Sequence, residues 1–223
     1  MSIAVTILGN SSAKPTATGH PSAQVVNVNE QYFLVDAGEG VQRQMARRGI
    51  SALKLRAVFL SHLHGDHMYG LFPLLSTLGL YGRRTPLRIY APRPFGEMLE
   101  CFLRLCETNL PYTPEWVEVD TTKHSTEVWS LPLRHRIPTA GYLFRQKEPA
   151  LNVKKYAIER YGLTVGQIVQ AKRGEDVVLE SGEVLSNDAI TYRPYGALSY
   201  AYCSDTNYSA RLARMVEGVD VLY

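Results

Sequence analysis

Cysteine is scarce in this sequence: the 223 residues include only three, Cys101, Cys106 and Cys203. An odd number without the spacing of a disulfide framework argues against structural disulfides and favours a reducing compartment. Cys101 and Cys106 lie five positions apart on an expected helix, and therefore on different faces, which argues against a thiolate zinc site. We expect all three to pack as apolar side chains.

Long apolar runs are also absent. No stretch approaches the roughly 18 consecutive apolar residues of a membrane-spanning helix. The first residues, Met1 to Leu8, lack the basic region and cleavage site of a signal peptide and have the apolar composition of a strand. With 45% hydrophobic and 20% charged residues, the sequence indicates a soluble cytoplasmic protein with one α/β domain and no membrane partner.

Net charge is low, at +3, and does not by itself predict binding to nucleic acid. The positive excess is concentrated in residues 146–174, a segment with a net charge of +4. Its six cations, against two acids, are Lys147, Lys154, Lys155, Arg160, Lys172 and Arg173. We interpret 146–174 as a basic insertion that projects from the core of a single domain covering 1–223.

Short apolar segments alternate with turns and amphipathic segments, which predicts a mixed α/β fold. Helices are expected at residues 41–48, 68–81, 95–108 and 206–217, with a further helix at 153–161 in the insertion. Strands are expected at 3–8, 24–28, 31–36, 56–61, 87–91, 116–120, 127–134, 141–144, 177–185, 199–203 and 219–223. This order favours a four-layer αββα sandwich, with two mixed sheets covered by helices on their outer faces.

Histidine is rare as well, yet three of the six histidines fall in one hexapeptide, His62-Leu63-His64-Gly65-Asp66-His67, directly after a buried strand. An extended backbone places His62 and His64 on the same side, and Gly65 permits the turn that brings Asp66 and His67 round to them. Three imidazoles and a carboxylate form a nitrogen and oxygen ligand set that suits zinc. The alternative is a solvated polar turn, in which these residues meet by chance.

The hexapeptide resembles the His-x-His-x-Asp-His signature of the metallo-β-lactamase superfamily. The resemblance implies that His62 and His64 bind one metal ion and that Asp66 and His67 bind a second. It further implies a hydrolase with two zinc ions per complete site, for which the superfamily alone allows lactams, thioesters, sulfates and phosphodiesters. A phosphodiester suits a metal pair that stabilises both the entering and the leaving oxygen, and Asp66 would act as both ligand and proton acceptor.

Two later residues match the remaining ligands of that superfamily. His135, at a strand end, corresponds to the third histidine of the first ion; otherwise it is an ordinary core or surface histidine. Asp205, in Ser204-Asp205-Thr206, corresponds to the carboxylate that bridges both ions. The alternative is that Asp205 or Thr206 caps the following helix. His20 and His124 match no ligand position.

Three further segments resemble ribonuclease Z, the tRNA 3′-processing endonuclease family. They are Leu34 to Gln44, which contains Asp36 and Gly38-Glu39-Gly40; Phe59-Leu60-Ser61 continuing to Gly70-Leu71; and the basic insertion. The resemblance implies a precursor tRNA substrate, a homodimer, and an insertion that acts as an arm for tRNA. In that arm the phosphate-binding candidates are Lys154, Lys155, Arg160, Lys172 and Arg173.

The sequence departs from that family at four places. Asn10 and Ser11 stand where Thr-Gly is usual, and the insertion has Gly166-Gln167 in place of Gly-Pro. The family's His-Glu-Ala-Thr motif and its last histidine ligand are not found before Tyr223, so we expect the C-terminal part of the fold to be missing and the second ion to keep only three ligands. Two rival functions stay open: another phosphodiesterase or arylsulfatase-like hydrolase with a small substrate, or a catalytically inactive RNA-binding relative.

Overall fold

The computed structural model describes the chain except residues 1, 15, 107–108 and 122–127. It forms two compact units, one made of Met1–Arg145 with Leu198–Tyr223 and the other of Gln146–Ala197. Each unit has its own hydrophobic core.

The first unit begins with a six-stranded sheet whose strands lie in sequence order. The strands are β1 (Ile3–Gly9), β2 (Ala23–Val28), β3 (Gln31–Val35), β4 (Leu55–Phe59), β5 (Leu87–Ala91) and β6 (Pro114–Glu118). The β1–β2 and β2–β3 pairs are antiparallel, whereas β3, β4, β5 and β6 are parallel neighbours. Consequently the residues that follow β3 and β4 emerge side by side at one edge of the sheet.

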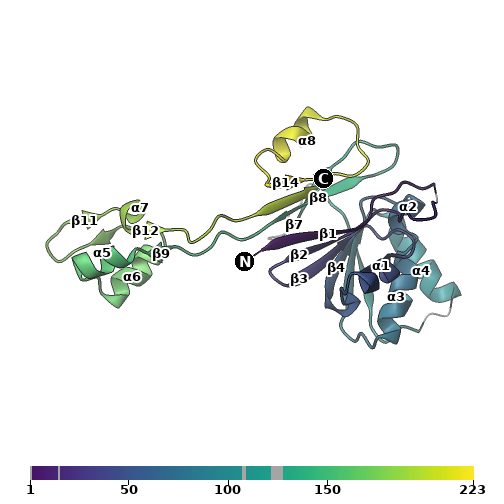
Figure 1. The fold of residues 1–223 in the computed structure, drawn as a ribbon, viewed down its shortest axis with the longest axis horizontal. Coiled ribbons are helices and arrows are strands. Elements are labelled where there is room, and N and C mark those ends of the chain that lie inside the picture. Colours follow the sequence, from purple (N-terminus) through teal and green to yellow (C-terminus); the bar gives the residue numbers. More distant parts are fainter. Residues whose placement is uncertain (1, 15, 107–108, 122–127) are drawn as a thin grey trace. The chain divides into compact units, whose positions relative to one another are not determined.

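Helices cover one face of this sheet (Figure 1). They are α1 (Val41–Arg47), α3 (Leu71–Leu80) and α4 (Pro94–Leu105), with a 3₁₀ turn, η1 (Ala52–Lys54), before β4. The buried side of α3, formed by Leu71, Leu74, Leu75 and Leu78, packs in one core with apolar residues of α1, α4 and the strands. This spacing of three and four residues is the pattern that predicted the helix.

A second sheet packs on the other face, in the order β14-β13-β8-β7. Its strands are β7 (Val128–Pro132), β8 (Ala140–Arg145), β13 (Ser199–Tyr202) and β14 (Val221–Leu222). Aromatic residues fill the space between the sheets, where Phe33 and Phe59 meet Tyr142 and Phe144. Helix α8 (Ala210–Met215) covers the outer face through Leu212, which packs on Leu131. The predicted αββα sandwich is confirmed.

One predicted helix is divided. Residues 68–81 contain the end of α2 (Gly65–Met68) and all of α3, with a break at Gly70. The Gly70 amide donates to the carbonyl of Ala37, and a Cβ on Gly70 would lie 2.0 Å from the carbonyl oxygen of Gly38. Close approach of two backbones therefore requires glycine here and ends the first helix. In the described part of the chain, no helix has the length and apolar character needed to cross a membrane.

The second unit is small and mixed. Its elements are β9 (Asn152–Val153), α5 (Lys155–Tyr161), α6 (Val165–Lys172), β10 (Val177–Val178), β11 (Val184–Leu185), α7 (Asn187–Ile190) and β12 (Thr191–Tyr192). The unit begins where the basic insertion was expected to begin, but it continues past Gly174 to Ala197. Val177 and Leu185, which we had placed in a core strand at 177–185, belong instead to this unit's own core with Ala157, Ala171 and Ile190.

Candidate metal centre

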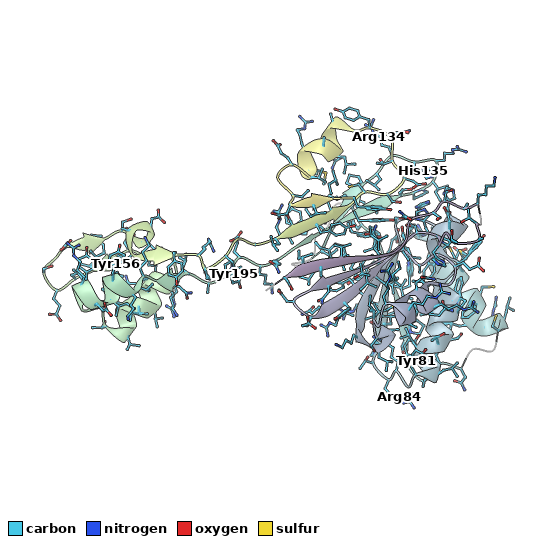
Figure 2. The ribbon with its side chains drawn as sticks, viewed as in Figure 1. Tyr81, Arg84, Arg134, His135, Tyr156 and Tyr195 are labelled. Atoms are coloured by element: carbon cyan, nitrogen blue, oxygen red, sulfur yellow. The ribbon has the colours of Figure 1, made fainter. Side chains whose placement is uncertain are left out.

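Three histidines from two separate loops converge at the edge of the sandwich. His62 and His64 follow β4. His135, labelled in Figure 2, lies in the loop after β7. The Nε2 atom of His62 is 2.9 Å from Nδ1 of His64, and Nε2 of His135 is 3.4 Å from that same Nδ1 atom. Two imidazole nitrogens bound to one zinc ion in tetrahedral geometry are separated by roughly 3.3 Å. The spacing therefore fits a shared ion.

Asp205 completes this cluster. Its carboxylate and the three imidazoles each offer one ligand atom, and all four atoms lie within 4.8 Å of one another. Its Oδ2 atom is 4.0 Å from Nε2 of His135, while its Oδ1 atom is 4.0 Å from Nε2 of His67. The two oxygens thus face different histidines, which is the arrangement that a bridging carboxylate requires.

The second group consists of His67, Asp66 and the other side of Asp205. Oδ2 of Asp66 lies 3.6 Å from Nε2 of His67. Both residues come from α2, which begins at Gly65, so one short helix orients both side chains. Three side chains, Asp66, His67 and Asp205, therefore lie close to this second position.

The ligands are held by Asp36, a fully buried carboxylate whose role the sequence analysis missed. Its Oδ2 atom accepts hydrogen bonds from Nδ1 of His67 at 2.6 Å, from the hydroxyl of Tyr202 at 2.6 Å and from Oγ of Ser61 at 2.8 Å. Its Oδ1 atom accepts from the Ser61 amide at 2.7 Å. Four donors therefore compensate the burial of one negative charge.

This network fixes the tautomers of two histidines. Because Nδ1 of His67 donates to Asp36, Nε2 keeps its lone pair and faces Asp66 and Asp205. The Ser61 hydroxyl donates its hydrogen bond to Asp36. In the contact between Ser61 Oγ and Nδ1 of His62, at 2.9 Å, the histidine nitrogen must therefore be the donor. Nε2 of His62 is then free to bind a cation. One buried carboxylate thus prepares both histidines as ligands.

Burial and hydrogen bonding separate the titration of these two rings. Burial, helped by the neighbouring His67, lowers the pKa of His62 to about 4, so this ring is neutral near pH 7. Burial also opposes the charged form of His67, but the hydrogen bond to Asp36 and the nearby carboxylates prevail and raise its pKa. The carboxylates that favour a proton on His67 would equally favour a metal ion, which would replace the proton on Nε2.

Backbone contacts join the loops that carry the ligands. The Arg134 amide donates to Oγ1 of Thr206 at 3.0 Å, and the Asn207 amide donates to the Arg134 carbonyl at 2.8 Å. These bonds fix the neighbour of His135 against the neighbour of Asp205. Neither Asp205 nor Thr206 caps α8, because the cap is Ser209, whose side chain accepts from the Leu212 amide.

The other histidines stand apart. His20 lies in the loop before β2 and does not belong to the ligand cluster. His124 lies outside the described residues. Asp36 could have been recognised from the sequence, because a charged residue that interrupts a buried run, Phe33-Leu34-Val35-Asp36-Ala37, requires a buried partner.

The five predicted RNA-binding cations all lie in the second unit, but their surroundings differ. Nζ of Lys154 donates to the carbonyl of Ala189 at 2.8 Å, and Nζ of Lys155 lies 3.6 Å from Glu159. The Arg160 guanidinium lies over the ring of Tyr161. Lys172 and Arg173, at the end of α6, are exposed and form no ion pair with any described residue.

Gln167, which stands in place of the usual proline, has a structural role in α6. Its backbone amide donates to Oγ1 of Thr164, and its side-chain Oε1 accepts from the Thr164 amide at 2.9 Å, so the two residues form a capping box. The pattern Thr-x-x-Gln is the signal for this helix, which the sequence analysis did not use.

Comparison with known proteins agrees with this geometry. The chain is 38% identical to the ribonuclease Z of Parabacteroides distasonis over 226 residues, which covers 98% of this chain and 74% of that protein. The crystal structure of human tRNase Z, short form, matches with a TM-score of 0.66 at 20% identity, covering 98% of this chain and 76% of that one. The metallo-β-lactamase fold protein YhfI from Bacillus subtilis matches with a TM-score of 0.63 at 19% identity, covering 99% and 70%. A family model described as anti-Pycsar protein Apyc1 matches residues 3–112.

Proposed function

Because this chain belongs to the ribonuclease Z family, we propose that it is a metal-dependent endoribonuclease that removes the 3′ trailer from precursor tRNA and leaves a 3′-hydroxyl. The observation that carries this proposal is the position of Asp205, whose two oxygens face two separate groups of potential metal ligands. Such a site suits a reaction in which two oxygens of one phosphate need stabilisation at once.

The residues fit a pair of divalent ions. His62, His64 and His135 would hold the first, Asp66 and His67 the second, and Asp205 both. When bound, two such ions supply electrostatic stabilisation to the entering and the leaving oxygen of a phosphodiester. The mixture of imidazole and carboxylate ligands, without thiolate, favours zinc as the metal.

Asp66 is the proposed catalytic residue. Its carboxylate lies at the mouth of the site with 13% of the side chain exposed. There it orients the attacking water and accepts its proton. His64 and His135 stay in place as ligands, held by the two loops that carry them.

The second unit supports recognition of the RNA. Lys172 and Arg173 are the cations best placed for phosphates, because their heads are exposed and have no competing acidic partner among the described residues. Lys154 instead serves the unit's own fold through its bond to Ala189. By family membership we also propose a cytoplasmic homodimer, which size-exclusion chromatography with light scattering would measure as twice the mass of one chain.

A direct assay tests the function. The zinc-loaded protein is incubated with a precursor tRNA carrying a 3′ trailer, and the products are mapped at nucleotide resolution. We expect one cut next to the acceptor stem, and we expect His64→Ala to lower the rate by a factor of about 100 or more, because metal ions contribute several kcal/mol to such reactions. Hydrolysis of a chromogenic diester without any cut in tRNA would support a small-molecule hydrolase. Binding of the RNA without cleavage of either substrate would support an inactive relative.

A further inference from the structure

A pocket of about 570 Å³ lies next to the proposed metal centre, within the first unit. Three segments line it: the loop between β1 and β2, the start of α1, and α2 with the residue that follows it. Asp66 contributes to its wall, so the pocket opens beside the reacting groups. Its volume suits one or two nucleotides and is too small for an RNA duplex.

The wall formed by α1 is basic. Arg43 and Arg47 are four residues apart, so they lie on the same face of the helix, and both line the pocket. Both are exposed and form no ion pair or side-chain hydrogen bond in the described part of the chain. Lys14 adds a third cation, while Glu39 and Asp66 are the acids in the lining. Free guanidinium groups in this position suit phosphate oxygens.

The lining also includes an exposed aromatic ring. Tyr69 has 63% of its surface exposed, directly after α2. Its ring lies against the backbone of the metal-binding motif, because a Cβ on Gly65 would be 2.3 Å from ring atom Cε2. Only glycine at position 65 therefore leaves room for the ring, which lines the pocket together with Asp66.

We propose that this pocket is a subsite for unpaired RNA flanking the scissile phosphate, in which Tyr69 stacks on a base and Arg43 and Arg47 bind the adjoining phosphates. The proposal rests on the proposed function for its substrate class. Stacking and phosphate contacts do not read base identity, so the subsite accepts different sequences. Such tolerance is what an enzyme needs for trailers or 3′ ends that differ between tRNAs.

Binding of a fluorescent oligouridylate of about eight nucleotides tests the subsite without relying on cleavage. Anisotropy is measured with the zinc-loaded protein over a series of salt concentrations, and a gel confirms that the oligonucleotide stays intact. We expect Tyr69→Ala to weaken binding about tenfold and Tyr69→Phe, which keeps the ring, to leave it within twofold of the parent. Arg43→Ala with Arg47→Ala should reduce the slope of log K against log salt by about 1.4, the amount for two phosphates of a single strand.

The matched control is Arg48→Ala, which removes a neighbouring exposed cation that does not line the pocket. If Tyr69→Ala and the double arginine variant bind the oligonucleotide like Arg48→Ala, the subsite proposal is wrong. It is also wrong if Tyr69→Ala slows hydrolysis of a small chromogenic diester as much as it weakens RNA binding, because the residue would then support the metal centre. Pocket-dependent binding of the oligonucleotide without cleavage of precursor tRNA would overturn the proposed function and leave the subsite standing.

A second pair of substrates distinguishes which side of the cut the pocket holds. Precursors with a trailer of one nucleotide and of several nucleotides are compared for the effect of Tyr69→Ala on KM. A larger effect with the long trailer assigns the pocket to the trailer, and an equal effect assigns it to the unpaired end of the mature tRNA. No effect with either precursor overturns the proposal.

Discussion

At the scale of single residues, the site depends on a buried charge outside the proposed ligand set. Asp36 accepts four hydrogen bonds and adopts a positive φ of 55°, a conformation that aspartate tolerates better than most side chains. Its bond to His67 and its link through Ser61 to His62 connect both halves of the ligand set. The residue that orients His62 and His67 is therefore outside the hexapeptide that contains them.

Replacement of this carboxylate should weaken metal binding without unfolding the protein. We expect Asp36→Asn to lower metal affinity or activity by about 10- to 100-fold, because the amide removes the charged acceptor that fixes the His67 tautomer. Elemental analysis of the purified protein and the rate on precursor tRNA measure the effect.

The matched control is Asp220→Asn. Asp220 also accepts bonds from the amide and Oγ of one serine, Ser199, but it lies at the other end of β13 from the ligands. Its replacement should leave the metal content unchanged. Equal metal loss in both variants would contradict the role given to Asp36.

At the scale of elements, two glycine backbones hold α2 and α3 against the loop after β3. A side chain on Gly70 would meet the Gly38 carbonyl and push the two segments apart, at a point where the Ala37 amide donates to the carbonyl of His67. We expect Gly70→Ala to destabilise the protein by about 1–3 kcal/mol through overpacking, measured by urea unfolding. Gly166→Ala, at an open position in α6, should leave the stability unchanged or raise it. If both variants unfold at the same urea concentration as the parent, the close approach is not required.

The capping box of α6 gives a second prediction at this scale. Thr164→Ala removes the cap that accepts the Gln167 amide, a loss of about 1 kcal/mol in helix stability. Amide hydrogens of α6 should then exchange about fivefold faster, while those of β3 and β4 keep their rates. Faster exchange throughout the chain, or no change in α6, would contradict a local capping role.

Most elements of the sandwich could be predicted from the sequence, since their apolar periodicity is strong. The strand at 87–91 has the bounds predicted for it, and β1, β2 and β3 differ by one residue at an end. The break at Gly70 and the helix α6 could not be found from periodicity. The first depends on a contact with Gly38, distant in sequence, and the second on a polar cap that carries no apolar signal.

At the scale of the whole molecule, the first unit carries the proposed metal ligands, and the second unit carries exposed cations such as Lys172 and Arg173. The clustering of His62, His64, His135 and Asp205 could be predicted because the motif matches a known family at fixed spacing. The extent of the second unit could not be predicted from the sequence. The short strands at Val177 and Leu185 have the apolar pattern of strands in the core of the sandwich, and only their packing on Ala157 shows that they belong to the second unit.

Removal of positive charge from the second unit should weaken RNA binding but leave the rate of the chemical step unchanged. We expect Lys172→Ala with Arg173→Ala to raise KM for precursor tRNA several-fold and to lower the salt slope of binding by about 1.8, the amount for two duplex phosphates. Hydrolysis of a small diester should not change. The control is Arg84→Ala in the first unit, an exposed cation (Figure 2) whose loss should leave KM within twofold. Equal effects of both changes would refute a specific role for the second unit.

The claim on which the account depends is that loops far apart in the chain meet to hold a pair of divalent ions. Anomalous diffraction from crystals grown with zinc and measured at the zinc absorption edge tests it most directly. The account predicts one peak bonded to His62, His64 and His135 at about 2.0–2.1 Å from their nitrogens, and a second beside Asp66 and His67, with Asp205 between them. A zinc-saturated crystal with no peak among these side chains would contradict it.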